Sequence, residues 1–259
     1  MNFFFGIESP LFKSRLFIPR FQNKNNKNTD YSLFEINIFE SLWQFTNREE
    51  FIFNNNFYKI DYDQIDNHKI YCLASETEIS KMDKNQFTKL ISFNDFTETS
   101  PAFRANLEIS IINGGFSSYQ SDYPYSMIEK KGNILSSINS LANSVAETNR
   151  IYFKNIYELP INKEFDIFFV DIEKRKVLKK VKALTNKTNE IEIEKKYIKP
   201  NIYLFSEKYI GIPIYVSIDN NHISMEHTHP PHEYILSKDR FRIVSDKKNE
   251  IYEIIKKNI

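Results

Sequence analysis

Glycine and cysteine are scarce in this 259-residue sequence, which contains five glycines and one cysteine. Too few glycines remain for glycine-rich phosphate-binding loops over most of the chain, because such loops need a backbone that approaches the ligand closely. The single cysteine, Cys72, cannot form an internal disulfide. Its apolar neighbours in Ile70–Ala74 favour a small residue of the core.

Long apolar runs and a strong net charge are also missing. Runs such as Ile167–Val170 are far shorter than the roughly 20 residues that a transmembrane helix needs. No basic residue precedes the apolar patch near Met1, which disfavours a signal peptide. The formal net charge is +1, so nothing in the overall charge favours a nucleic-acid partner. We therefore expect a cytoplasmic protein that binds neither nucleic acid nor a membrane.

Large aromatic side chains are abundant, with 23 Phe and 15 Tyr against one Trp. Hydrophobic residues at 41% and charged residues at 27% are typical of a globular chain with a substantial core. Residues 1–259 are predicted to form one compact unit. A change of texture near Thr97–Pro101 allows a subdivision into a mixed α/β part, 1–98, and a mainly β part, 99–259. No internal repeat is visible.

Period-two alternation of apolar and polar residues dominates the chain. It occurs in Phe34–Ile38 and again in Phe103–Ile111. In the second segment Arg104, Asn106 and Glu108 share the polar face, because side chains alternate along a strand. This face is either exposed to solvent or the floor of a pocket, and Arg104 and Asn106 are candidate ligand-binding residues.

Short strand-like segments recur at regular spacing between residues 165 and 235, separated by turn-rich pieces such as Thr185–Asn189. They are FDIFFVDI, KVLKKVKAL, EIEIE, NIYLFSE and IPIYVSI. This spacing predicts an antiparallel unit, a β-sandwich or jelly-roll-like structure in the C-terminal part. The predicted fold class is therefore mainly β with a few helices (α+β).

Three segments have helical patterns. Ser75–Glu78 has the form of a capping box and precedes apolar residues at helical spacing as far as Ile91. A second helix is predicted over about 133–146, and a third from Ser245 or Asp246 onward.

Four of the five histidines lie within His222–His232. If residues 223–229 continue as a strand, His227 and His229 point to the same side of it. Two imidazoles at that spacing can reach one metal ion. This stretch is the sharpest chemical signal in the sequence.

The pair Pro230-Pro231 would end such a strand, because proline has no N–H to donate. The chain could then turn so that His232 or Glu233 supplies a third ligand, a set that suits Zn²⁺ or Fe²⁺ with an open coordination position. The candidate metal ligands are His227, His229 and Glu233, and the candidate catalytic residues are Glu226 and His232.

The order His227-x-His229-x3-Glu233 resembles the first motif of the cupin superfamily. The resemblance implies a metal ion held by these residues inside a small jelly-roll barrel. The chain departs from that pattern because Ser217–Glu226 contains no glycine and 234–259 contains neither Gly nor His. Two metal-free readings stay open: acid–base chemistry by imidazoles, and histidines that only hydrogen-bond the backbone.

A second notable stretch, residues 113–133, combines Gly114-Gly115 with tyrosines, hydroxyls, an amide and a carboxylate. Aromatic faces mixed with directional polar groups suit a sugar, although an ordinary surface loop would have the same composition. The candidate ligand-binding residues are Tyr119, Gln120, Asp122 and Tyr123. We expect this loop to lie beside the histidine cluster and to share a pocket with it.

The predicted function is a metal-dependent enzyme that acts on a carbohydrate or another small polar metabolite through the histidine cluster, with Zn or Fe as cofactor. The alternative is a non-enzymatic β-sandwich module that binds a glycan or belongs to an assembly. In that case Tyr119, Tyr123 and Tyr125 would be stacking platforms. The reaction, the substrate and the oligomeric state are left open.

Overall fold

Strands are the main secondary structure in the computed structural model, which describes residues 2–20, 31–86, 105–121, 131–140, 142–208, 213–227 and 235–259. The first eight strands are β1 (Asn2–Phe4), β2 (Lys13–Pro19), β3 (Tyr31–Phe39), β4 (Leu42–Asn47), β5 (Phe57–Ile60), β6 (Ile70–Ser75), β7 (Ala105–Ser110) and β8 (Phe116–Ser121). The others are β9 (Lys131–Ser137), β10 (Thr148–Lys154), β11 (Glu164–Asp171), β12 (Lys176–Leu184), β13 (Thr188–Glu192), β14 (Ile202–Lys208), β15 (Ile214–Asp219) and β16 (His222–His227). The α-helices among the described residues are α1 (Glu76–Ser80) and α2 (Arg240–Asn258).

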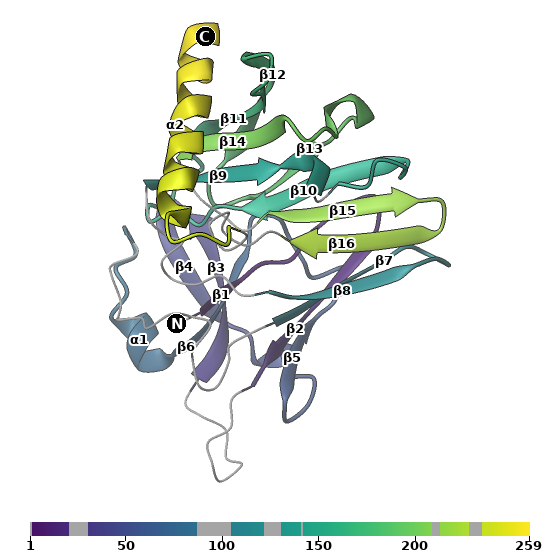
Figure 1. Ribbon diagram of the computed structural model, residues 1–259. Helices are drawn as coiled ribbons and strands as arrows, with labels where there is room; N and C mark the ends of the chain where they lie inside the picture. Colours follow the sequence, from purple (N-terminus) through teal and green to yellow (C-terminus); the bar gives the residue numbers. More distant parts are fainter. Residues whose placement is uncertain are drawn as a thin grey trace.

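The strands form four antiparallel sheets of four strands each (Figure 1). We number them sheet 1 (β1-β6-β3-β4), sheet 2 (β5-β2-β7-β8), sheet 3 (β13-β10-β15-β16) and sheet 4 (β12-β11-β14-β9). Together they are organised as a four-bladed β-propeller of small sheets. The predicted sandwich or jelly roll is therefore wrong: the strands between 165 and 235 are antiparallel as expected, but they are divided between sheets 3 and 4.

The strand order of the first half of the chain is repeated in the second half. Adding eight to every strand number of sheet 2 gives sheet 3, and adding eight to those of sheet 1 gives sheet 4 read from its other edge. The chain thus consists of an N-terminal unit, β1–β8, and a C-terminal unit, β9–β16, with the same topology. The expectation that there is no internal repeat does not hold at the level of structure.

Equivalent strands also share side-chain chemistry. Ser14–Ile18 in β2 reads S-R-L-F-I, and Asn149–Phe153 in β10 reads N-R-I-Y-F. The central apolar residues pair in the same way, Leu16 with Ile60 on β5 and Ile151 with Ile191 on β13. The neighbouring arginines each form an ion pair with an acidic residue on that side, Arg15 with Asp61 at 2.7 Å and Arg150 with Glu192 at 2.9 Å.

A buried polar residue at the start of each of these strands holds the loop before it. The Ser14 hydroxyl donates to the carbonyl of Ile7. In the C-terminal unit the Asn149 side chain donates to the carbonyl of Asn143 at 2.9 Å and accepts from its N–H at 2.9 Å. Both side chains are buried, so these bonds satisfy loop backbone groups that have no strand partner.

Sheets 1 and 2 pack face to face around one apolar core, to which Ile36, Leu16 and Leu107 contribute. This core continues into sheet 3 of the C-terminal unit through Tyr152 and Val216. The other face of sheet 3 packs on sheet 4 in a second core. One face of sheet 3 therefore covers the N-terminal unit, while the opposite face lines its own unit.

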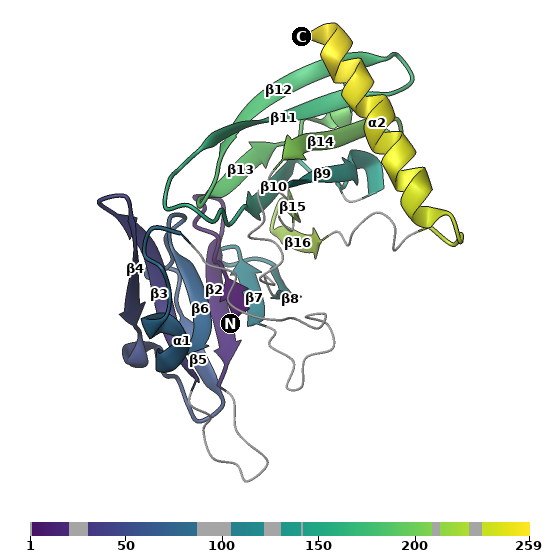
Figure 2. The ribbon, with the colours of Figure 1, turned by 90° about the vertical axis from the view of Figure 1, so that its left-hand side faces the viewer.

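Helix α2 lies across the outer face of sheet 4 (Figure 2). It buries Val244, Ile251 and Ile254 against Phe168 and Phe205. Those apolar positions recur at helical spacing, and burial of this stripe stabilises a helix that would be marginal alone. The predicted C-terminal helix is confirmed, although it begins earlier, at Arg240.

The other two helix predictions have different outcomes. Ser75 forms the predicted capping box with Glu78, but α1 spans only Glu76–Ser80, and the residues from 87 to Ile91 lie outside the described residues. The predicted helix over 133–146 is wrong. Its first part belongs to β9, which pairs with β14, so strand pairing across the chain overrides a local apolar periodicity.

The two units meet at equivalent hairpin turns. The N–H of Gly115, after β7, donates to the carbonyl of Asn221, in the turn between β15 and β16. A Cβ atom added at Gly115 would lie 2.8 Å from the backbone N of Ile223 and 3.0 Å from the Asn221 carbonyl oxygen. The backbone of Ile223 cannot move freely, because Ile223 pairs with Ile218 between β16 and β15.

Replacing Gly115 with Ala is expected to lower the free energy of unfolding by about 1–3 kcal/mol, because the methyl group overpacks this junction. Urea denaturation of the variant measures the loss, and Ser118→Ala on the exposed side of β8 is the matched control. A Gly115→Ala variant as stable as Ser118→Ala would show that the two turns separate without cost.

Candidate functional site

The outer face of sheet 2 carries the most distinctive exposed surface in the described part of the chain. Along β2, Ser14, Leu16 and Ile18 are buried, whereas Lys13 and Arg15 are exposed. Strand pairing extends the outward-facing side chains in rows across the sheet, since partners in register share a face. We call this surface the aromatic face; it comprises Lys13, Arg15, Phe17, Phe53, Phe57, Lys59, Asp61, Tyr62, Asn106 and Glu108.

Three phenylalanines form the apolar part of the aromatic face. Phe17 meets Phe53 and Phe57 edge to face, with ring centroids 6.1 and 6.4 Å apart. Phe53 is 57% exposed and Phe57 is 39% exposed. Lys59 Nζ lies 5.4 Å from the centroid of Phe53. Large aromatic rings held in this way in contact with water are unusual outside interaction sites.

Ion pairs form the polar part of the aromatic face. Asp61 accepts from Arg15 Nε at 2.7 Å and lies 2.8 Å from Lys59 Nζ. Burial raises the pKa of Asp61, but the hydrogen bonds from Lys59 and Arg15 outweigh it and leave this pKa below its usual value. Asn106 Nδ2 donates to Glu108 at 3.2 Å, and Arg15 lies 4.0 Å from the same carboxylate.

Four charged groups of the aromatic face are thus linked by ion pairs: Arg15, Lys59, Asp61 and Glu108. Lys13 Nζ lies 4.3 Å from the centroid of the Tyr62 ring. A group that is already paired in its resting geometry is poorly placed to transfer protons or to hold an ion. What the face offers instead is a broad apolar surface with a rim of fixed charges, which is the composition of the centre and rim of a protein interface.

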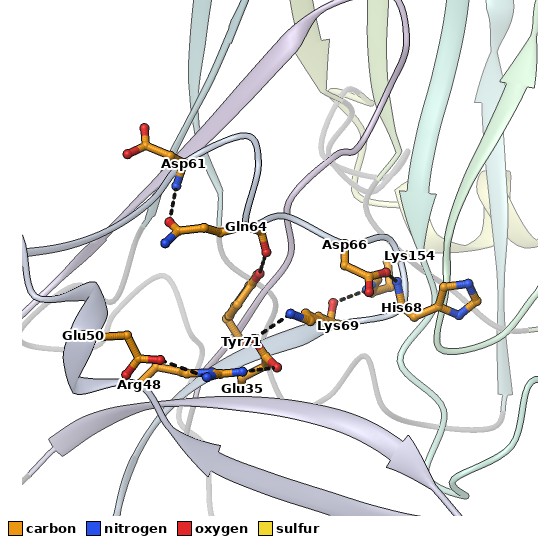
Figure 3. A network of polar contacts seen from close by, with 10 residues as sticks. All are labelled: Glu35, Arg48, Glu50, Asp61, Gln64, Asp66, His68, Lys69, Tyr71 and Lys154. Carbon is orange, nitrogen blue, oxygen red and sulfur yellow. Dashed lines mark hydrogen bonds and ion pairs between the residues drawn. The ribbon is translucent and has the colours of Figure 1, made fainter.

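A second polar network lies at the joint between the units (Figure 3). Glu35 is 4% exposed, and its carboxylate meets Arg48 at 2.7 Å and Lys69 at 3.2 Å. Arg48 also bridges to the exposed Glu50 at 2.8 Å. Burial raises the pKa of the adjacent Tyr71, whose hydroxyl donates to the carbonyl of Gln64 at 3.3 Å.

Lys154, the last residue of β10, is fully buried beside this network. Its ammonium donates to the carbonyl of Lys69 in the N-terminal unit. Burial lowers the pKa of Lys154 to about 7, although Asp66 acts in the opposite direction. Nearby, the N–H of Thr188 donates to the carbonyl of Asn67 at 2.7 Å. These bonds tie sheet 3 to the loop before β6, so we assign the network a structural role.

The structure places three of the predicted site residues by their side chains. Asn106 lies on the aromatic face, while Glu226 and His227 end β16. His227 Nδ1 lies 3.3 Å from the Glu226 carboxylate, which also accepts from the His227 N–H at 3.0 Å. Tyr119 and Gln120 belong to β8 and pair with Leu107 and Asn106 through the backbone.

The other predicted site residues lie outside the described residues: Arg104, Asp122, Tyr123, His229, His232 and Glu233. Within the described ranges no group of three or more His, Cys, Asp or Glu side chains could hold a metal ion. This finding corrects the predicted histidine metal site within the described residues, where His227 is the one candidate ligand and lies beside Glu226. His222 does not join this pair: it is exposed at the start of β16 and pairs with Asp219. The part of the site that depends on His229 and Glu233 stays a prediction.

The predicted proximity of the 113–125 loop and the histidine strand is confirmed for the parts that the structure describes. Ser117 Oγ accepts from the N–H of Met225 at 3.2 Å, which places β8 beside β16. A pocket shared by the two segments stays a prediction.

Sequence reasoning missed the aromatic face. Phe53 and Phe57 flank the run Asn54–Asn56, a polar turn in which phenylalanine has no core to enter. Aromatic residues beside an asparagine-rich turn were the available signal. Phe17 carried none, because it lies in an apolar strand and only the pairing of β2 shows that it faces outward.

Comparisons with known proteins add no relationship. No family model matches the chain, and neither the search of curated proteins nor that of solved structures found a similar protein. None of the helices in the described ranges combines the length and apolarity needed to cross a membrane.

Proposed function

We propose that this protein is a non-enzymatic interaction module that binds another protein through the aromatic face. The observation that carries the proposal is a cluster of the exposed Phe53 and Phe57 around the half-buried Phe17, held by edge-to-face contacts on the sheet. Rigid aromatic side chains lose little conformational entropy on binding and dominate the energetics of protein interfaces.

The arrangement of charges favours a protein over a glycan. A sugar requires hydrogen-bonding groups that are free to turn toward its hydroxyls, whereas Arg15, Lys59 and Asp61 are bound to one another. Paired charges of this kind suit the rim of a protein interface, where they contribute register rather than affinity.

The glycan-binding module and the metal-dependent enzyme predicted from the sequence are untested as functions. The second depends on His229, His232 and Glu233, which lie outside the described residues. The assembly alternative is the one that the described surface supports.

A photo-crosslinking amino acid at position 57 tests the proposal. Phe57→benzoylphenylalanine, illuminated in the cells that produce the protein, is expected to give a discrete covalent adduct with a protein. The matched control carries the same amino acid in place of Phe241, which is 61% exposed on α2. No adduct at position 57, or the same adducts at both positions, would refute an interface at the aromatic face.

A further inference from the structure

The repeated topology gives the aromatic face an exact counterpart inside the molecule. Phe17 on β2 corresponds to Tyr152 on β10, because S-R-L-F-I and N-R-I-Y-F occupy equivalent strands and pair in the same register with their neighbours. Tyr152 is only 1% exposed, and its neighbours Ile214 and Val216 on the same face are equally buried. The counterpart of the aromatic face is thus an interface, not a free surface.

What covers that counterpart is the neighbouring unit. The loop between β1 and β2 packs on Tyr152: the Phe12 ring lies 5.5 Å from it in an edge-to-face contact, and the Ser9 hydroxyl lies 3.0 Å from its hydroxyl. The edge of β8 adds the bond from Met225 N–H to Ser117. A unit of this topology therefore has two docking surfaces. One is the outer face of the sheet that contains β2 or β10, which we call the donor face. The other consists of the loop before that strand and the last strand of the unit, β8 or β16, which we call the acceptor surface.

Among the described residues one donor face and one acceptor surface are left over. The free donor is the aromatic face. The free acceptor lies on the C-terminal unit, where Ser144, Val145 and Glu147 correspond to Ser9, Pro10 and Phe12, counting back from Asn149 and Ser14. All three are exposed, and Val145 is 74% exposed. Ser224 on β16 is the exposed counterpart of Ser117.

The two free surfaces carry opposite charge. The aromatic face holds Lys13, Arg15 and Lys59 against Asp61 and Glu108, a net charge of +1 from these five groups. On the acceptor, Glu147 stands where the N-terminal unit has Phe12, and Glu226 lies close to Ser224 on β16. Lys195, whose ammonium donates to the Val145 carbonyl at 3.4 Å, leaves a net charge of −1 there.

From these observations we infer that the protein assembles head to tail with itself. The aromatic face of one copy docks on the acceptor surface of the next, Ser144–Glu147 with Ser224, in the way that sheet 3 docks on the N-terminal unit within one chain. This inference rests on the proposed function, because it names the partner of the aromatic face. Each head-to-tail oligomer still has one unused donor face and one unused acceptor surface. Further copies can therefore add and give a series of oligomers, unless the last copy docks on the first and closes a ring.

Analytical ultracentrifugation of the purified full chain, over about 1–100 µM, measures the assembly, since weak protein contacts have dissociation constants in this range. We expect the average mass to rise with concentration above the 30.9 kDa of one chain. Two variants each remove one surface: Phe53→Ser/Phe57→Ser blocks the donor, and Val145→Arg blocks the acceptor. Each alone is expected to stay at 30.9 kDa, because every contact needs both surfaces.

Mixing the two variants is the decisive arm. Each retains the surface that the other lacks, so the mixture is expected to form a dimer of twice 30.9 kDa and nothing larger. All three substitutions lie at exposed positions, and far-UV circular dichroism with thermal melts verifies folding. Phe241→Ser, on the exposed side of α2, is the control that should assemble like the wild type.

Each other outcome overturns the inference in a recognisable way. A wild type that stays monomeric up to about 100 µM excludes self-assembly of useful strength. A Val145→Arg variant that still dimerises shows that the aromatic face pairs with itself. If the wild type is monomeric but position 57 crosslinks to a different protein, self-assembly fails while the proposed function stands.

Discussion

An Arg48→Met variant is expected to lose about 3 kcal/mol of stability, because it leaves the carboxylate of Glu35 buried with only part of its compensation. Glu35 is 4% exposed and is held by Arg48 at 2.7 Å and by Lys69 at 3.2 Å. Methionine restores most of the volume but neither the charge nor the donors. Urea denaturation at neutral pH gives the loss as a lower midpoint at unchanged slope.

Two controls separate the buried pair from a surface contact. Glu50→Gln removes the other partner of Arg48, which is 55% exposed, and is expected to cost less than about 1 kcal/mol. Adding Glu35→Leu to Arg48→Met removes the stranded carboxylate and should recover part of the loss. Equal losses in Arg48→Met and Glu50→Gln would mean that the carboxylate of Glu35 is solvated well enough to need no partner.

Local pattern was sufficient to predict individual strands. The alternation in Phe103–Ile111 appears as β7, with Ala105, Leu107 and Ile109 buried and Asn106 facing outward. Cys72 is buried in the core as its apolar neighbours indicated. Alternation reports which side of a strand is buried, and that information is contained in a few consecutive residues.

The arrangement of the strands could not be predicted in the same way. β1 pairs with β6, and β10 pairs with β15, so most neighbours in a sheet are far apart in the sequence. Strands β12 and β13 follow each other in the sequence and yet belong to different sheets. Period-two patterns are identical in a sandwich and in a propeller blade, because both bury one face or two faces of similar strands.

The duplication was hidden for a related reason. The two units share the pattern of strand pairing, but few equivalent positions carry the same residue. Arg15 and Arg150 are identical, whereas Phe17 corresponds to Tyr152 and Phe12 to Glu147. Only the register of the sheets aligns these positions. The aromatic face could not be recognised from the sequence, since its meaning comes from the comparison with sheet 3.

Lys154 makes the second large prediction, which concerns pH. Burial lowers its pKa from about 10.5 in the unfolded chain to about 7 in the folded protein, against the opposing influence of Asp66. Between these values the unfolded chain binds a proton that the folded protein does not, so the free energy of unfolding rises with pH. The contribution of Lys154 to the free energy of unfolding is therefore most unfavourable at pH 7 and below.

Replacing Lys154 with Met is expected to stabilise the protein at pH 7 and to leave it less stable, relative to the wild type, near pH 10.5. The difference in pKa, 10.5 minus 7, corresponds to roughly 5 kcal/mol of stability that the variant gains at pH 7. The variant loses about 1–3 kcal/mol of this gain, because the carbonyl of Lys69 no longer has a hydrogen-bond donor. The net gain at pH 7 is then on the order of 2–4 kcal/mol. Because tyrosines and other lysines titrate in the same window, the quantity to measure is the difference between variant and wild type.

Urea denaturation of both proteins at intervals from pH 6 to pH 10 gives that difference directly. Lys238→Met, at an exposed position before α2, is the matched control and should follow the wild type at every pH. If Lys154→Met instead runs parallel to the wild type across the range, the ammonium keeps its charge in the folded state. Asp66 and the Lys69 carbonyl would then compensate its burial in full, and sheet 3 would be joined to the N-terminal unit by a true buried ion pair.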